Sequence, residues 1–429
     1  MRNLGIYIQV PFCQTKCTYC NFHTGVVSSD RFAPYMEAVC HEIRNHRELL
    51  RAGGVHWTEG FDWEALQQKW VAHDCVDTVY IGGGTPSLLP PELLTSMIDA
   101  LRETFSCAFG EVTLEADPET IDGEKAARWL AAGVNRISFG TQSFVDDELR
   151  AAGRMHRRDD IYRSISVLRE VGVPNISFDL IAGLPKQTQD SWRQSLDELI
   201  ELSPEHVSIY MMEIDEGSRL GLEVLRGGPR YSARDLPSED SMVEFYQIAQ
   251  TLLNSAGYEQ YEISNWAKPG FESRHNLKYW RREPYLGFGA GAHSFSGTQR
   301  WANVHDAASY VGAILSGRTA QQAVERVTRD AALEEGLFLG LRQLAGIDFH
   351  GIEREYDVGL RAKVDRLTSA GMLERVGALV RIPAEKMSVS NEIFVELLRD
   401  LISLERSQGE ARRGDDDVHR SKRQSAGGA

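Results

Sequence analysis

Three cysteines near the amino terminus are the strongest candidates for chemistry in this sequence. Cys13, Cys17 and Cys20 form a C-x3-C-x2-C pattern shortly after the apolar run GIYIQV (5–10). Three thiolates on one short loop can hold three irons of a four-iron cluster and leave the fourth iron open to an exogenous chelator. The alternatives are a zinc site that lacks one ligand, and packing cysteines with a coincidental spacing. The spacing favours the cluster, because zinc sites usually contain paired C-x2-C motifs.

A repeated alternation of strands and helices must position this loop. Between residues 5 and 215, short β-branched runs alternate with longer stretches of helical periodicity. The predicted strands are 5–10, 77–82, 111–116, 135–140, 175–183 and 206–211. This alternation predicts an α/β fold with a parallel sheet, either an open doubly wound sheet or a partial barrel. In both architectures, ligands bind beyond the carboxyl ends of the strands.

Polar and glycine residues recur at the carboxyl ends of these predicted strands. A glycine run, Gly82 to Gly84, and Thr85 come directly after the second strand, where glycines let a ligand approach the backbone and expose N–H groups. The other polar residues at or near these ends are Glu115, Gln142, Arg154 and Asp179. Each alone is more often a cap or a surface group. Their shared edge, however, is what a single ligand site requires.

The segments IYIQVPFCQTKCTYC and YIGGGTPSLL resemble the radical S-adenosylmethionine (SAM) superfamily. They are most similar to the branch that contains oxygen-independent coproporphyrinogen III dehydrogenases and the HemW haem chaperones. The resemblance runs from Tyr7 to about residue 400 and implies a partial (β/α)6 barrel, with a 4Fe-4S cluster on the three cysteines and SAM on the open iron. The SAM contacts that it implies are Tyr7, Tyr19, Gly83, Gly84, Thr85, Glu115, Gln142, Arg154 and Asp179. One departure is Gln9, where relatives commonly have His.

A second motif, Arg274-His275-Asn276-Leu277-Lys278-Tyr279-Trp280, is similar to the H-N-x-x-Y-W signature of the HemW group. The resemblance implies haem binding. His275 would supply an axial imidazole, while Tyr279 and Trp280 would pack against the edge of the porphyrin. The alternative is an aromatic core cluster with a hydrogen-bonded histidine.

Two features favour a haem chaperone that delivers haem to acceptor proteins over the alternative, a SAM-dependent coproporphyrinogen III dehydrogenase of porphyrin biosynthesis. The dehydrogenases carry a fourth cysteine two positions past the triad, whereas here Cys20 is followed by Asn21 and Phe22. They also have a long extension before the triad, whereas twelve residues precede Cys13 here. A dehydrogenase would need to anchor several propionates, for which Arg136 and Arg154 are candidates. A third class, RNA-modifying radical SAM enzymes, fits poorly with the charge of the chain.

The 429 residues carry 47 Lys and Arg against 62 Asp and Glu, a net charge of −15 that argues against nucleic acid as a partner. We expect a cytoplasmic protein, because the sequence contains neither a signal peptide nor an apolar run of membrane-spanning length. Homodimerisation and peripheral membrane contact are left open.

The domain organisation can also be predicted from the sequence. We expect a core barrel over 1–234 with an insertion near 51–75, and a connecting region over 235–320 that carries HNLKYW. A small, mostly helical domain over 321–405 follows, with a winged helix as one candidate fold. Residues 406–429 contain no aromatic residue and no Ile, Leu or Met, which predicts a disordered tail.

Overall fold

The computed structural model describes residues 3–55 and 75–399 and divides the chain into two compact units, Met1–Thr328 and Arg329–Ala429. Most of the insertion expected near 51–75, and the whole tail expected over 406–429, lie outside the described residues. The four-part division expected from the sequence stays a prediction.

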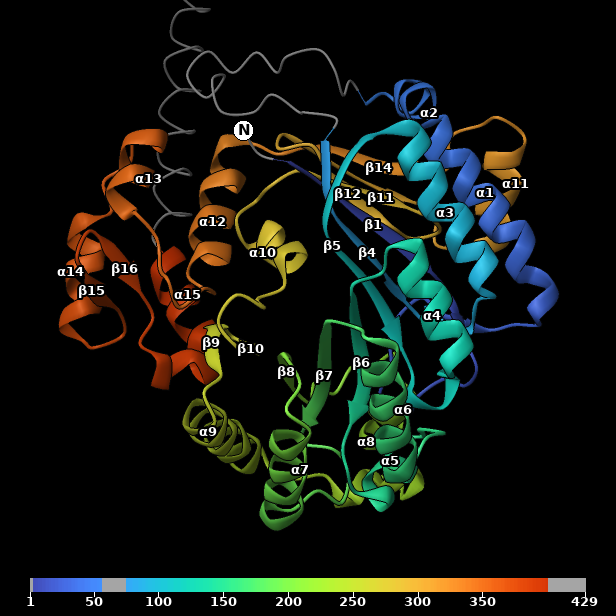
Figure 1. Cartoon of the computed structure of the whole chain (residues 1–429). Coiled ribbons are helices and arrows are strands. Elements are labelled where there is room, and N and C mark those ends of the chain that lie inside the picture. The colour runs from blue at the N-terminus through green and yellow to red at the C-terminus, as the bar shows by residue number, and fades with distance from the viewer. Residues whose placement is uncertain (1–2, 56–74, 400–429) are drawn as a thin grey trace, which may run out of the picture. The chain divides into compact units, whose positions relative to one another are not determined.

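The first unit is built on a twelve-stranded sheet whose centre is parallel (Figure 1). Its six central strands follow the order of the chain: β1 (Leu4–Val10), β4 (Cys75–Gly83), β5 (Ser106–Ala116), β6 (Arg136–Gln142), β7 (Asn175–Ala182) and β8 (His206–Met211). All neighbours among them are parallel, with Tyr7 opposite Tyr80 in β1 and β4. The six predicted strands and the α/β fold class are therefore confirmed.

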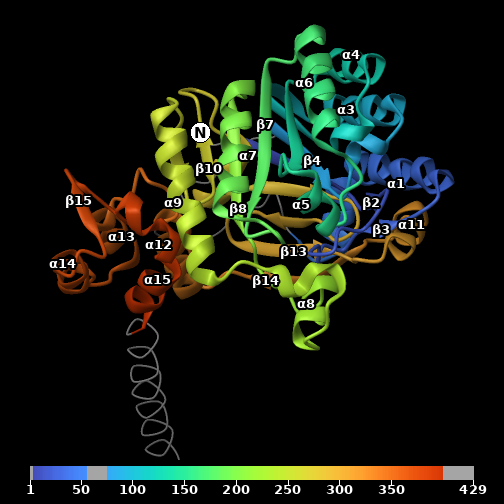
Figure 2. The same cartoon turned by 90° about the horizontal axis from the view of Figure 1, so that it is seen from below.

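Helices cover one face of this parallel sheet, as Figures 1 and 2 show for α3, α4 and α6. The helices up to the last third of the unit are α1 (Phe32–Arg44), α2 (His46–Ala52), α3 (Pro91–Thr104), α4 (Gly123–Ala132), α5 (Asp146–Ala151), α6 (Arg158–Val171), α7 (Gln189–Leu202), α8 (Arg219–Leu225) and α9 (Glu239–Ser255). Helix α3 buries Leu94, Met97 and Leu101, which lie on one face at helical spacing. Because strand side chains alternate, Ile6 and Ile8 of β1 are buried, while Tyr7 points to the opposite face.

The last third of the unit extends both edges of the sheet. Strand β11 (Tyr285–Phe288) pairs in parallel with β1, and β10 (Asn265–Ala267) pairs antiparallel with β8. The remaining elements are β9 (Glu259–Glu262), α10 (Arg274–Trp280), β12 (His293–Phe295), β13 (Gln299–Asn303), α11 (Ala307–Leu315) and β14 (Gln321–Arg326). The region that carries HNLKYW thus continues the same sheet.

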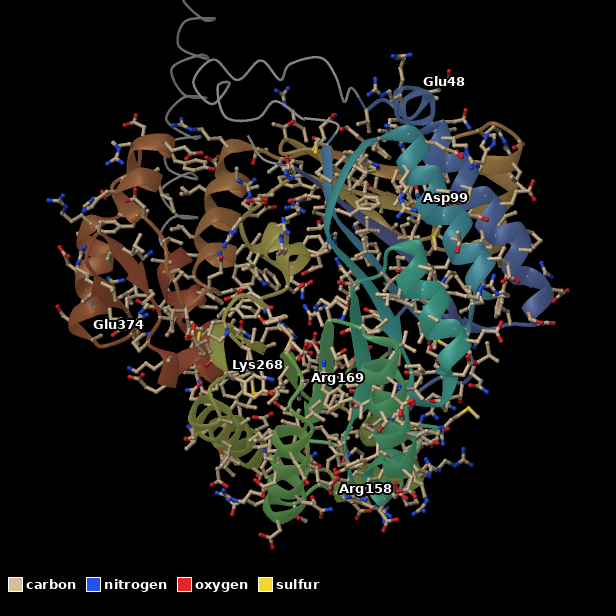
Figure 3. All side chains as sticks on the ribbon, viewed as in Figure 1. Glu48, Asp99, Arg158, Arg169, Lys268 and Glu374 are labelled. Carbon is tan, nitrogen blue, oxygen red and sulfur yellow. The ribbon has the colours of Figure 1, made fainter. Side chains whose placement is uncertain are left out.

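The second unit is small and mostly helical. It contains α12 (Arg329–Gly340), α13 (Phe349–Tyr356), α14 (Arg361–Ser369), β15 (Glu374–Val376), β16 (Leu379–Arg381) and α15 (Ser390–Leu398). The hairpin of β15 and β16 turns at Gly377, whose φ of 62° suits glycine. Glu374, labelled in Figure 3, accepts a hydrogen bond of 2.6 Å from Arg381 across this hairpin.

Several basic side chains on the surface of the first unit are paired with carboxylates. Arg158 and Arg169 of α6, both labelled in Figure 3, lie 2.7 Å from Glu198 and 2.9 Å from Glu205. In both pairs the arginine is partly exposed and the carboxylate is largely buried. None of the helices in the two described ranges has both the length and the apolar character needed to span a bilayer.

Candidate iron–sulfur site

The cysteine loop leaves the carboxyl end of β1 and folds back on itself. Cys13 ends β2 (Phe12–Cys13), which pairs in parallel with β3 (Gly25–Val26), so the loop that carries Cys17 and Cys20 is closed at its base. Burial raises the pKa of the Cys13 and Cys20 thiols, and the nearby cysteine sulfurs raise it further. The loop therefore gathers three partly buried thiols in one place.

The chemistry of these donors suits an iron–sulfur cluster. Each thiolate of a four-iron cluster binds a different iron, so the three sulfurs do not need to converge on one point. Within the described residues, no three His, Cys, Asp or Glu side chains are gathered closely enough to hold a single metal ion. The C-x3-C-x2-C spacing favours the cluster, and both the cluster and the zinc alternative stay predictions.

The glycine turn after β4 packs directly against the cysteine loop. Its N–H groups are used inside the protein, because Gly84 donates to Val10 O at 2.8 Å and Thr85 donates to Phe12 O at 2.6 Å. Gly83 donates to the Glu115 carboxylate at 2.8 Å. The expectation that these N–H groups are exposed to a ligand is therefore wrong. The turn can offer a ligand only carbonyl oxygens and side chains.

Two carboxylates of the predicted SAM site lie inside the barrel. Glu115 accepts hydrogen bonds from Gly83 N and from Tyr80 Oη at 2.8 Å, and burial raises its pKa to about 7. Asp179 Oδ2 accepts from Ser138 at 3.0 Å, while its Oδ1 is buried and has no hydrogen-bond partner among the described residues. Burial raises the pKa of Asp179 as well. An unpartnered buried carboxylate oxygen is an acceptor that a ligand can use.

Arg154 connects the cysteine loop to the carboxyl end of β5. Its guanidinium contacts Asp117, donates to Gly140 O at 2.9 Å and lies 3.4 Å from the Cys17 sulfur. Burial opposes the charged form, but Asp117 and Cys17 raise the pKa of Arg154 above its ordinary value. Asp117 also accepts from the Thr85 hydroxyl at 3.0 Å. Sequence reasoning missed Asp117, although its position two residues after Glu115 places both carboxylates on the same face of the chain.

Asp117→Ala is expected to destabilise the protein by about 3 to 5 kcal/mol, because it leaves the buried Arg154 charge without its partner. The side chains of Arg154 and Asp117 are only 9% and 20% exposed. Denaturant unfolding would measure the loss. The matched control is Asp147→Ala, whose partner Arg150 is 56% exposed, and which should cost less than about 1 kcal/mol. An equal loss of unfolding free energy in the two variants would contradict the expectation that the buried Arg154 charge depends on Asp117.

The other predicted SAM residues surround the same edge. Tyr7 donates to Gln9 Oε1 at 2.6 Å and stacks on Tyr80, with ring centroids 6.1 Å apart. Tyr19 packs against an apolar group that includes Ile181, Leu184 and Met212. Gln142 ends β6 with a φ of 64°, a left-handed conformation that is uncommon outside glycine. Gln9, which stands where relatives commonly have His, thus orients the Tyr7 hydroxyl.

The HNLKYW segment is packed against other parts of the first unit. His275 is completely buried, with Nδ1 3.0 Å from Thr78 Oγ1 and Nε2 2.9 Å from Tyr279 Oη. Burial, then Lys278 and Arg136, lower its pKa to about 3. Tyr279 packs edge-on against Tyr285 at 4.7 Å, and Trp280 is partly buried. These surroundings are those of the hydrogen-bonded core histidine, the alternative to a haem ligand.

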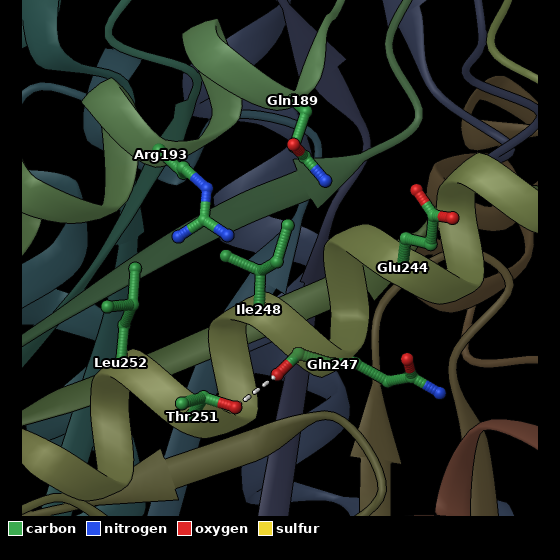
Figure 4. A pocket seen from close by; sticks show the side chains of 7 residues that line it. All are labelled: Gln189, Arg193, Glu244, Gln247, Ile248, Thr251 and Leu252. Atoms are coloured by element: carbon green, nitrogen blue, oxygen red, sulfur yellow. Dashed lines mark hydrogen bonds between the residues drawn. The ribbon is translucent and has the colours of Figure 1, made fainter.

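A surface pocket of about 290 Å³ between α7 and α9 lies away from these residues (Figure 4). It is lined by Gln189, Arg193, Glu244, Gln247, Ile248, Thr251 and Leu252. None of them is a predicted site residue.

Comparisons with known proteins agree with the cysteine motif. Residues 7–199 match the pattern of the Radical SAM superfamily. The chain is 33% identical over 401 residues to the haem chaperone HemW of Bacillus subtilis, covering 92% of this chain and 99% of that protein. It is 32% identical to the mitochondrial radical S-adenosyl methionine domain-containing protein 1 of Mus musculus, covering 92% and 88% of the two chains.

The solved structure of HemN, the coproporphyrinogen III oxidase of Escherichia coli, shares the fold. It superposes with a TM-score of 0.76 at 23% identity, covering 92% of this chain and 90% of HemN. The radical SAM barrel expected from the sequence is therefore confirmed, and the helical second unit agrees with the expected C-terminal domain. The chain belongs to the HemW family of the radical SAM superfamily.

Proposed function

We propose that this protein is a haem chaperone, which binds haem and delivers it to an acceptor protein. The observation that carries the proposal is the similarity to HemW haem chaperones over nearly the whole of both chains. A 4Fe-4S cluster with SAM on its open iron supplies one-electron chemistry in this superfamily.

The residues of the proposed cofactor site would have different roles. Cys13, Cys17 and Cys20 would each bind one iron. Arg154, held by Asp117, places a positive charge 3.4 Å from the Cys17 sulfur. The remaining SAM contacts proposed from the resemblance are Tyr7, Tyr19, Gly83, Gly84, Thr85, Glu115, Gln142 and Asp179. Their common place at the carboxyl edge of the sheet supports this assignment.

The alternative, coproporphyrinogen III dehydrogenase activity, needs cations that anchor propionates. Of the two candidates, Arg154 is already engaged by Asp117, Gly140 and Cys17. The alternative therefore rests on Arg136, which is only 2% exposed and whose Nε has no hydrogen-bond partner among the described residues.

One preparation of cluster-reconstituted protein tests both functions. We expect saturable binding of ferric protoporphyrin IX, followed by its transfer to apomyoglobin, and no decarboxylation of coproporphyrinogen III in the presence of SAM and a reductant. Decarboxylation by a protein that binds no haem would establish the dehydrogenase instead.

Asp179→Asn is expected to weaken SAM binding about tenfold or more without changing the iron content. The variant keeps the shape of the side chain but removes the charge next to a buried, unpartnered oxygen, and a hydrogen bond to a charged group contributes about 1.5 to 3 kcal/mol. Anaerobic calorimetric titration with SAM would measure the change. Asp197→Asn, on the exposed side of α7, is the control. Unchanged SAM affinity in the Asp179 variant would remove this residue from the site.

A further inference from the structure

Three histidines from separate segments lie together beside the cysteine loop. We call them the imidazole cluster: His23 between Cys20 and β3, His293 at the start of β12, and His305 after β13. The rings of His23 and His305 are stacked, with centroids 4.1 Å apart and planes inclined by 32°. His293 lies beside this pair, because Asn303 donates to Ala292 O at 3.0 Å and Gly291 donates to Val304 O at 2.9 Å, so that its segment runs next to that of His305. Partial burial, then His305, Arg300 and His23, lower the pKa of His293. All three histidines are exposed.

The ring nitrogens of the imidazole cluster are available for a ligand. Among the described residues, no group hydrogen-bonds to a ring nitrogen of His23, His293 or His305. His275 differs in each respect, because it is fully buried and both of its ring nitrogens have partners in the barrel. An iron bound to His275 would have to displace Thr78 or Tyr279, whereas an iron at the imidazole cluster would displace only water.

The surface next to the imidazole cluster is unusually apolar. Phe22 and Val26 of the cysteine loop are 65% and 61% exposed, and Val27 is 41% exposed. His23 lies in the same short segment as these three side chains. Exposed apolar groups that gather in one place mark a binding surface more often than a solvated one. A porphyrin has two flat apolar faces and a central metal that binds imidazole, so it matches both parts of this surface.

On the basis of the proposed function, we propose that haem binds at the imidazole cluster with His293 as its axial ligand, while Phe22, Val26 and the stacked pair cover the porphyrin. His23 and His305 cannot be ligands on opposite faces of one iron, because their rings already stack on each other. His293 is the third imidazole, and its backbone is fixed by pairing with Ala302. A ring nitrogen lone pair forms the bond to iron and a water leaves, with no change in oxidation state.

Haem titration of four variants tests the assignment. Full-length, cluster-reconstituted protein is titrated with ferric protoporphyrin IX and followed by Soret absorbance. We expect His293→Ala to lose the spectrum of histidine-ligated haem and to bind at least tenfold more weakly. Free imidazole should restore the spectrum, which it would not do if the histidine had only a structural role. Phe22→Ser should weaken binding without changing the ligand spectrum, and His41→Ala on α1 should change neither. His275→Ala should retain the spectrum.

The outcomes separate this inference from the proposed function. If His293→Ala keeps the histidine-ligated spectrum while His275→Ala loses it, the ligand assignment is wrong and the chaperone function stands. If the unaltered protein binds no haem, the proposed function itself is wrong. Iron content and denaturant unfolding are measured for each variant. If His293→Ala folds poorly, His293→Gln replaces it and must show the same loss, and a retained spectrum in His293→Gln overturns the proposal.

Discussion

Replacing any one of Cys13, Cys17 and Cys20 with alanine is expected to remove the iron–sulfur cluster. Anaerobic reconstitution of the unaltered protein should give about four irons per chain, because each thiolate holds one iron and the fourth takes an exogenous ligand. Each alanine variant leaves an iron without its protein ligand. Iron analysis and the visible absorbance of the cluster would measure the loss.

The other three cysteines provide matched controls for this experiment. Cys40 is buried in α1, and Cys75 and Cys107 lie on neighbouring strands at the amino ends of β4 and β5. None of them is near the loop after β1, so Cys40→Ala, Cys75→Ala and Cys107→Ala should retain the cluster. Tight zinc binding without iron-dependent absorbance would refute the cluster assignment.

Gly84→Ala is expected to abolish most of the cluster and to destabilise the fold. A Cβ at this position would lie 2.3 Å from the Phe12 carbonyl oxygen and 2.9 Å from the Cys13 sulfur. The Phe12 carbonyl is backbone and already accepts from Thr85 N, so it cannot move without shifting the cysteine loop. Forcing an extra methyl group into a packed site costs about 1 to 3 kcal/mol.

Gly123→Ala is the control for this substitution. It lies at the start of α4, and a Cβ there would meet no atom within 4 Å. Alanine is also the better helix former, so this variant should be as stable as the unaltered protein or more so. Iron content after reconstitution and denaturant unfolding would be compared for the two variants. If the Gly84→Ala protein keeps a full cluster, the close packing of the glycine turn against the cysteine loop is not needed for cluster binding.

The periodicity of apolar residues in the sequence was sufficient to predict the parallel strands at the centre of the sheet. It was not sufficient to predict the strands at the edges of the sheet. The strands of the core are long, buried and β-branched, as in NISFDLIA of β7, and each is separated by a helix of regular spacing. The edge strands after residue 258 are short: β10 and β12 have three residues each. Runs of this length contain no measurable period, and the glycines around β11 indicate turns. Their pairing depends on contacts with β1 and β8 that are far away in the sequence.

The sequence predicted those parts of the candidate site whose chemistry depends on residue type alone. It did not predict the parts that depend on hydrogen bonds between distant residues. The cysteine spacing pointed to one loop, which the structure closes with the pair of β2 and β3. The internal use of the Gly84 and Thr85 N–H groups could not be predicted, because their acceptors are carbonyl oxygens of the cysteine loop. The role of Asp117 depends in the same way on Arg154, which follows it by 37 residues.

The pairing of β1 with β11 has a consequence for how the protein is made. Strand β1 is complete at Val10, but the strand that covers its outer edge begins only at Tyr285. At about 5–20 residues per second, a ribosome needs roughly 14 to 55 s to synthesise the chain between them. During that time the first strand of the nascent chain keeps an open edge, which other nascent chains can pair with. Expression from a weak promoter, with few ribosomes on each message, places fewer such edges next to one another and should therefore give more intact protein and less aggregate.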